Sequence, residues 1–228
     1  MRSSMLILTC ALLGCSSAAL KEGNPRSQRK ERPMRTVTLD QSTVGAIISE
    51  HMVGFETCQS RGAGHFVSGA AIVQFSIGGD QRVERVHVID SSLGSWAIEQ
   101  CLLQAARFLT FPLPKDADRG EFRYPFSFNE VAERITVPKP ESWGYASLGA
   151  QRAGFNGCRS RYGFDGPFHI TAYISSTGRP RSVGFHSRKP APDDFASCVV
   201  NVTGEAKFPS TRGAIVKYRG LVEYLGGN

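Results

Sequence analysis

Apolar residues follow two periods along the first half of this chain, one typical of helices and one typical of strands. Between residues 44 and 55 they recur every three or four positions, which predicts a helix with one buried face. Apolar and polar residues alternate over 71–77 and 83–88, on either side of a Gly-Gly-Asp turn, which predicts a β-hairpin. A helical pattern over 98–108 and an alternating run over 122–128 complete the predicted order: helix, strand, strand, helix, strand.

The second half of the chain predicts the same order of elements. A glycine-containing apolar segment over 143–155 predicts a first helix, and alternation over 168–174 and 183–185 predicts a second hairpin. A helix is expected over 192–204, beginning at Pro-Asp-Asp and ending at a glycine. A last strand is expected over 215–224.

A sequence repeat explains why the two halves agree. The motif G-F-x-x-C-x-S occurs at Gly54–Ser60 and again at Gly154–Ser160. A second cysteine follows each copy, Cys101 in the first and Cys198 in the second, and a Phe-Pro pair lies ten residues beyond each of them. Matched positions of this kind indicate a tandem of two small homologous domains.

These patterns predict an α+β fold for each copy. We expect two helices on one face of a three-stranded antiparallel sheet, because both helices must bury their apolar faces. Pro125 cannot donate a hydrogen bond to a neighbouring strand, so the strand that contains it should be an edge strand or bulged. The predicted organisation is a signal peptide (1–14), a basic flexible tether (15–35), a first domain (36–130), a linker (131–141) and a second domain (142–228).

Four of the six cysteines are expected to form disulfides. Four cysteines allow three connectivities, and the repeat favours Cys58–Cys101 and Cys158–Cys198, which keep each bond inside its own copy. Closing loops of this size stabilises a small domain by about 4 kcal/mol. A zinc site is the competing use of four cysteines, but no C-x-x-C pair is present.

The N-terminal segment has the pattern of an export signal. Arg2 precedes an apolar run that is too short to span a bilayer. The run ends in Leu-Leu-Gly-Cys15, which resembles the lipobox of bacterial lipoproteins, so Cys15 is the predicted lipidation site. Because Ser16 follows it, we expect an outer-membrane anchor facing the periplasm. Cleavage after Ala19 is the alternative, and it would give a secreted or soluble periplasmic protein.

Positive charge is concentrated in the second copy. The net charge is +7, and residues 142–228 carry eleven Lys and Arg against five Asp and Glu. A solvated surface is one explanation, and attraction to anionic head groups or acidic polymers is the other. The candidate basic face comprises Arg179, Arg181, Arg188, Lys189, Arg212, Lys217 and Arg219.

Several of these features occur together in a known family. They are Cys58, the Val73–Ile77 strand, the Ser-Ser-Leu-Gly at 91–94, Cys101 and the Phe-Pro at 111–112. With them, residues 39–129 resemble the AgmX/PglI C-terminal domain, a relative of the TonB C-terminal domain, and the likeness extends in weaker form to about 142–228. One departure is that the family usually has Cys-Tyr where this chain has Cys58-Gln59 and Cys158-Arg159.

The resemblance implies a periplasmic, non-enzymatic domain that serves envelope transport or motility machinery, without cofactors. TonB-like domains can accept a partner's peptide along an exposed sheet edge. The residues themselves offer no catalytic or metal-ligand motif, because the five histidines are not at ligand spacing and no G-x-S-x-G occurs. Nucleic acid is disfavoured as a partner because the chain is expected to be exported.

Two function classes besides an unrecognised enzyme therefore follow from the sequence. The first is a lipid-anchored module that binds envelope proteins. The alternative is a binding protein for an acidic envelope polymer, either peptidoglycan or lipopolysaccharide.

Overall fold

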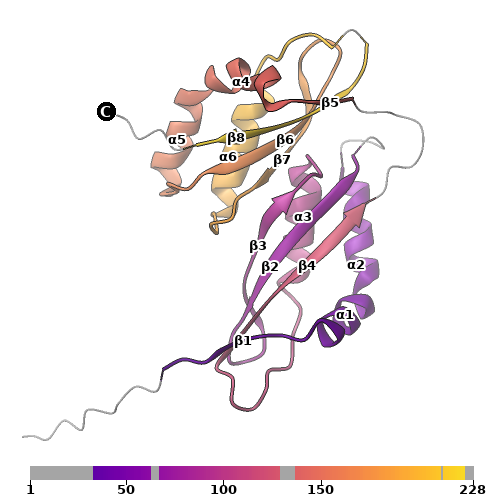
Figure 1. The fold of residues 1–228 in the computed structure, drawn as a ribbon, viewed down its shortest axis with the longest axis vertical. Coiled ribbons are helices and arrows are strands. Elements are labelled where there is room, and N and C mark those ends of the chain that lie inside the picture. The colour runs from indigo at the N-terminus through magenta and orange to yellow at the C-terminus, as the bar shows by residue number, and fades with distance from the viewer. Residues whose placement is uncertain (1–32, 63–66, 129–136, 212, 224–228) are drawn as a thin grey trace, which may run out of the picture. The chain divides into compact units, whose positions relative to one another are not determined.

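A computed structural model describes residues 33–62, 67–128, 137–211 and 213–223 (Figure 1). From Met34 onward these residues belong to one compact unit. The fold is a mixed α+β structure with two sheets. The predicted signal peptide, Cys15, most of the tether and Arg212 lie outside the described residues.

The first half contains a four-stranded sheet with strand order β1-β4-β2-β3. Its elements are β1 (Thr36–Thr38), α1 (Gln41–Glu50), α2 (Met52–Glu56), the 3₁₀ helix η1 (Thr57–Arg61), β2 (Gly69–Ile77), β3 (Val83–Ser91), α3 (Trp96–Ala106) and β4 (Arg119–Phe128). The central strand β2 is antiparallel to both β3 and β4, whereas β1 pairs in parallel with the start of β4.

The second half repeats this arrangement, with strand order β5-β8-β6-β7. Its elements are β5 (Val137–Lys139), α4 (Glu141–Gly149), α5 (Arg152–Tyr162), β6 (Phe168–Ile174), β7 (Pro180–His186), α6 (Asp193–Gly204) and β8 (Val216–Val222). Here β6 is antiparallel to β7 and β8, and β5 pairs in parallel with the start of β8.

Each sheet therefore has one strand more than the three predicted. β1 and β5 contain three residues each, too few to show an alternating pattern in the sequence. β5 and the first residue of α4 also occupy the end of the predicted 131–141 linker. Arg35, the last residue of the predicted tether, already contacts the loop before β4, because its backbone N–H donates to Asp118 Oδ2 at 2.8 Å.

The first helix of each half is interrupted rather than continuous. Asp40 caps α1 as its polar neighbours predict, by accepting a hydrogen bond from the backbone N–H of Thr43 at 3.0 Å. The helical pattern then breaks at His51, and η1 follows α2. In the second half α5 runs on to Tyr162, beyond the predicted end at residue 155.

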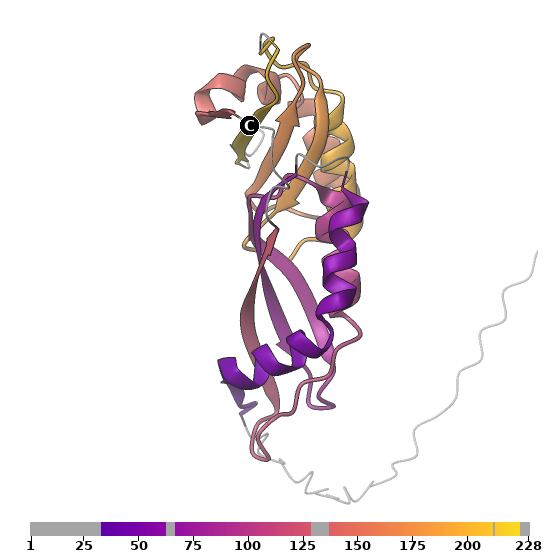
Figure 2. The same cartoon turned by 90° about the vertical axis from the view of Figure 1, so that its right-hand side faces the viewer.

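The helices of each half bury their apolar faces against one face of the sheet. In the first half Ile48, Phe55 and Leu102 from the helices join Val73 and Phe75 from β2, and all are at most 1% exposed. Figure 2 shows α2, the vertical purple helix, on one side of these strands. The helical pattern over 98–108 predicts a buried position for Phe108, but Phe108 is 87% exposed because α3 ends at Ala106.

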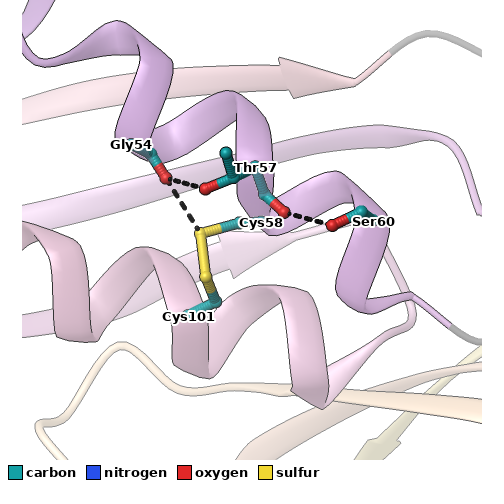
Figure 3. The surroundings of a disulfide bond; sticks show 5 residues. All are labelled: Gly54, Thr57, Cys58, Ser60 and Cys101. Atoms are coloured by element: carbon teal, nitrogen blue, oxygen red, sulfur yellow. Dashed lines mark hydrogen bonds between the residues drawn. A yellow bond between two sulfur atoms is a disulfide. The ribbon is translucent and has the colours of Figure 1, made fainter.

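Both predicted disulfides are present. Cys58 in η1 bonds to Cys101 in α3, and Cys158 in α5 bonds to Cys198 in α6, with Cα–Cα distances of 5.5 and 5.8 Å. Figure 3 shows the first bond and the carbonyl of Gly54, which lies 3.6 Å from Cys58 Sγ. Each bond joins two helices that cover the same sheet, as the repeat predicts.

Hydrogen bonds also connect the two halves. Tyr173 of β6 is fully buried and belongs to the first core, and its hydroxyl exchanges hydrogen bonds of 3.0 Å with the backbone of Ser68. Ser182 Oγ donates to the carbonyl of Gly94 at 2.7 Å, and Trp96 Nε1 donates to Ser197 Oγ at 3.0 Å.

A buried glutamic acid side chain lies among these contacts. Glu99 of α3 has no exposed surface, and it accepts hydrogen bonds from Ser91 Oγ at 2.7 Å and from the backbone N–H of Phe185 at 2.8 Å. Burial raises the pKa of Glu99 to about 8, although both hydrogen bonds favour its ionised form. A titratable group therefore joins α3 of the first half to β7 of the second.

Candidate binding surfaces

The C-terminal strand of the second sheet has one edge that is only partly paired. β8 pairs with β6 along its whole length, whereas β5 covers its other edge only at Val216–Tyr218. Within the described residues, no strand pairs with that edge over 219–222. Unpaired edge groups of this kind are a template for an added strand.

The matching edge of the first sheet is less suited to strand addition. β1 pairs with β4 only at Arg119–Glu121, so the edge is open from residue 122 onward in the described part of the chain. Pro125 lies in this open stretch and has no N–H to donate. The strand of Pro125 was expected to be an edge strand or bulged: β1 is the outer strand of this sheet, but β4 has an open edge at Pro125 itself. The proline makes this edge a poorer template than that of β8.

An apolar pocket lies beside the open edge of β8. It has a volume of about 250 Å³, and its apolar lining comes from Tyr145 and Leu148 of α4, Phe155 of α5, and Leu221 and Val222 of β8. Charged residues also line it: Glu141, Arg152, Arg159 and Glu223. Tyr145 is 69% exposed, a high value for a large apolar side chain. The pocket has room for one or two apolar side chains next to backbone groups that could hold their main chain.

Two glycines bring α4 close to β8 and so form this pocket. A Cβ atom at Gly144 would lie 2.5 Å from Tyr218 Cζ, and one at Gly220 would lie 2.7 Å from Leu148 Cδ1. The contact is fixed by the hydroxyl of Tyr218, which donates to the carbonyl of Glu141 at 3.1 Å. Burial raises the pKa of Tyr218 to about 12, so this hydroxyl stays protonated at neutral pH.

A second and larger hollow lies on the face of the first sheet that points away from its core. It has a volume of about 1050 Å³, and its lining includes Gln74 of β2, His87 of β3 and Arg123 of β4. His169 and Arg219 of the second half also line it. We call this hollow the polar groove, because hydrogen-bonding side chains make up most of its lining.

The predicted basic face is divided by the fold. Of its described members, Arg188 and Arg219 line the polar groove. Lys217 instead donates to the carbonyl of Ser68 at 2.7 Å, and Lys189 forms an ion pair with Asp165. Two other members, Arg179 and Arg181, are exposed and are not among the residues that line the groove.

An arginine, a histidine and a carboxylate meet at one wall of the polar groove. Arg219 Nη2 donates to Asp90 Oδ1 at 2.8 Å and to His186 Nε2 at 3.0 Å. Burial, and then the charge of Arg219, lowers the pKa of His186 to about 3, so its ring accepts this hydrogen bond in the neutral form. The ring of His169 stacks on that of His186, with centroids 4.8 Å apart.

The sequence did not identify Arg123 or the histidines as groove residues. His87, His169 and His186 are far apart along the chain and were expected to be ordinary surface or partly buried residues. Only the pairing of β6 with β7, which places His169 opposite His186, brings two of them together. No local motif carries that information.

Within the described ranges, no group of three or more His, Cys, Asp and Glu side chains is arranged to hold a metal ion. Among the helices of the same residues, none has both the length and the apolar character needed to cross a bilayer.

Comparisons with known proteins give no family assignment. No family model matches the chain, and no similar curated protein or solved structure was found.

Proposed function

We propose that this chain is a non-enzymatic lipoprotein of the bacterial cell envelope that binds an extended segment of a partner protein along β8. In this proposal Cys15 carries the lipid, the anchor is in the outer membrane, and the folded part faces the periplasm. The partner belongs to envelope transport or motility machinery.

The proposal also assigns the two halves to a type of domain. We infer two tandem TonB C-terminal-like domains, each built from the order helix, strand, strand, helix, strand with a short parallel strand added. The matching strand orders and the matching disulfides support this inference.

The open edge of β8 beside an apolar pocket is the observation that carries the proposed binding mode. An added strand gains main-chain hydrogen bonds from the edge, and a neighbouring pocket selects its side chains. The pocket formed by Tyr145, Leu148 and Leu221 would take one apolar side chain of the partner.

Site-specific photo-crosslinking tests this binding mode. A photoreactive residue at position 145 should give a covalent partner adduct in cells that make the protein, and mass spectrometry should identify the partner. Val53, which is 73% exposed on α2 of the first half, is the control position and should give no such adduct. Equal adducts at both positions would count against a site at β8.

A substitution gives the matched functional test. Because Tyr145 is largely exposed, Tyr145→Ser should leave the folded structure intact and weaken capture of that partner by about tenfold, the equivalent of about 1.4 kcal/mol. Unchanged capture would show that the pocket does not hold the partner.

The second candidate function is binding of an acidic envelope polymer. The observation that favours it is the meeting of Arg123, Arg188 and Arg219 around the polar groove.

A further inference from the structure

The floor of the polar groove is a sheet face, not a sheet edge. Ile72, Gln74 and Ser76 of β2 line it, and they alternate with the core residues Val73 and Phe75. The backbone of β2 is already paired on both sides, with β3 and with β4. A ligand in this groove must therefore be held by side chains and cannot be added as a strand.

Two arginines in the lining keep donor groups for a ligand. Arg123 Nε donates to Gln74 Oε1 at 2.8 Å, which orients the guanidinium group, and no other partner for Arg123 occurs among the described residues. Arg188 is exposed, and its side chain has no hydrogen-bond or ion-pair partner in the described part of the chain. Arg123 is held in place with its terminal nitrogens available, which suits bidentate binding of a carboxylate, and Arg188 adds a second available guanidinium group.

The carboxylates of the lining do not cancel these charges. Asp90 already accepts from Arg219, which leaves Glu121 as the other carboxylate of the lining. Arg123 and Arg188 therefore outnumber the one carboxylate that is not paired with an arginine. The groove has a positive balance even with its histidines neutral.

The three histidines add no positive charge at neutral pH, and only His169 offers its ring to a ligand. Both ring nitrogens of His87 and Nδ1 of His186 are buried, and His186 Nε2 is bound by Arg219. Burial is the main cause that lowers the pKa of His87, His169 and His186. His169 is only partly buried, so its neutral ring can donate or accept at the groove surface. Gln74 and Ser76 add further neutral groups, which together suit a ligand rich in hydroxyls.

The lining also disfavours other classes of anionic ligand. Phe122 is its one aromatic residue besides the histidines, and it is 2% exposed with its ring packed in the core against Phe75. Stacking of nucleic-acid bases, which needs exposed aromatic faces, is therefore unsupported. The neutral lining is mostly polar, so it offers few anchors for the apolar side chains of a peptide.

We propose that the polar groove binds a linear glycan that carries carboxylates, with Arg123 and Arg188 as the carboxylate-binding residues. Arg219 is held by Asp90 and His186, and it forms the wall against which the chain lies. The volume of about 1050 Å³ reaches the upper end of sites that enclose a whole small ligand, so several sugar units fit. This inference names the site for the second candidate function and is independent of strand addition at β8.

Calorimetric titration with tetragalacturonic acid tests the inference on the full chain. The wild-type protein should bind it, should not bind the neutral maltotetraose, and should lose affinity as salt is raised. The double variant Arg123→Ala/Arg188→Ala should bind at least tenfold more weakly. Arg161→Ala/Arg179→Ala removes two exposed arginines outside the groove and should retain the wild-type affinity.

Each other outcome would overturn the proposal. Equal weakening in both double variants would indicate general attraction to a basic protein, and absence of binding would reject the ligand class. If tetraglutamate bound equally well with the same dependence on Arg123 and Arg188, the groove would be a site for acidic peptides. Thermal unfolding of both variants provides the control for folding, and Tyr145→Ser should leave glycan binding unchanged.

Discussion

Glu99 is the residue whose chemistry links the two halves of the molecule most directly. Its pKa in the folded protein is about 8, whereas an exposed glutamate has a value of 4.5. Between these values the folded protein retains a proton that the unfolded chain releases, so the free energy of unfolding falls as pH rises. Above pH 8 the full cost of the buried charge is present.

The titration of His186 in the polar groove has the opposite effect on the free energy of unfolding, and it does so at lower pH. The pKa of His186 is lowered from 6.5 to about 3, so the unfolded chain binds a proton that the folded protein does not. Stability from His186 is therefore present above pH 6.5 and is lost as pH falls toward 3. The effect of Glu99 is best measured above pH 7, where the histidines of this groove contribute little.

Replacing Glu99 with Gln should remove the pH dependence in that range. Wild-type stability should fall by about 1 kcal/mol from pH 7 to pH 8, whereas the variant should be level and more stable at pH 8. The amide can still accept from Phe185 and can donate to Ser91 Oγ. Urea unfolding at each pH measures this, and Glu205→Gln, at an exposed position, serves as the control. Parallel curves for wild type and E99Q would contradict a protonated Glu99.

At the scale of single elements, α4 offers a matched pair of glycines. A methyl group at Gly144 would collide with the buried ring of Tyr218, at 2.5 Å from Cζ, whereas Gly149 at the end of the same helix has no atom within 4 Å of a Cβ position. We therefore expect Gly144→Ala to destabilise the protein by about 1–3 kcal/mol, which is typical of overpacking.

Gly149→Ala is the control in the same helix and should be neutral or slightly stabilising, because alanine favours a helix over glycine. Thermal unfolding of the two variants gives the comparison. If both had the same melting temperature, α4 would not be closely packed against β8, and the pocket proposed for a partner would be poorly formed.

The elements also show how much of the fold the sequence predicts. Alternation located β2, β3, β4 and β6, because each has one face buried by its own helices. Thr171 and Tyr173 of β6 are buried on the other face, by contacts with the first half. Their burial depends on tertiary packing, so the local pattern could not reveal it.

The candidate sites were less predictable than the fold, because they too depend on tertiary packing and not on a local pattern. Charge counting identified Arg188 and Arg219, but it grouped them with Lys189 and Lys217, which are bound elsewhere in the structure. Arg123 lies in the first half, where the net charge gives no sign of a basic site. An edge strand was predicted at Pro125, yet the more suitable edge at β8 becomes evident only once β5 is seen to stop at Tyr218.

At the scale of the whole molecule, the two sheets share contacts that should couple their stability. Trp96 packs against both cores, and Arg107, directly after α3, forms a 2.6 Å ion pair with Asp193 of α6. Trp143, the second of the two tryptophans, packs only within the second half, against Phe208 and Tyr218. A Trp96→Phe background therefore makes fluorescence a probe of the second half alone. Because it also removes the hydrogen bond from Trp96 to Ser197, the test concerns the contacts that remain, those of Glu99, Tyr173 and Ser182.

Removing the disulfide of the first half and observing Trp143 of the second half tests this coupling. In the Trp96→Phe background, Cys58→Ala/Cys101→Ala should destabilise the first half by about 3–4 kcal/mol, because a loop of 43 residues is no longer closed. If the contacts of Glu99, Tyr173 and Ser182 bind the halves into one folding unit, the Trp143 transition should move to lower urea. Far-UV circular dichroism should give the same midpoint. A Trp143 midpoint that stays in place while circular dichroism splits into two steps would show that each half unfolds on its own.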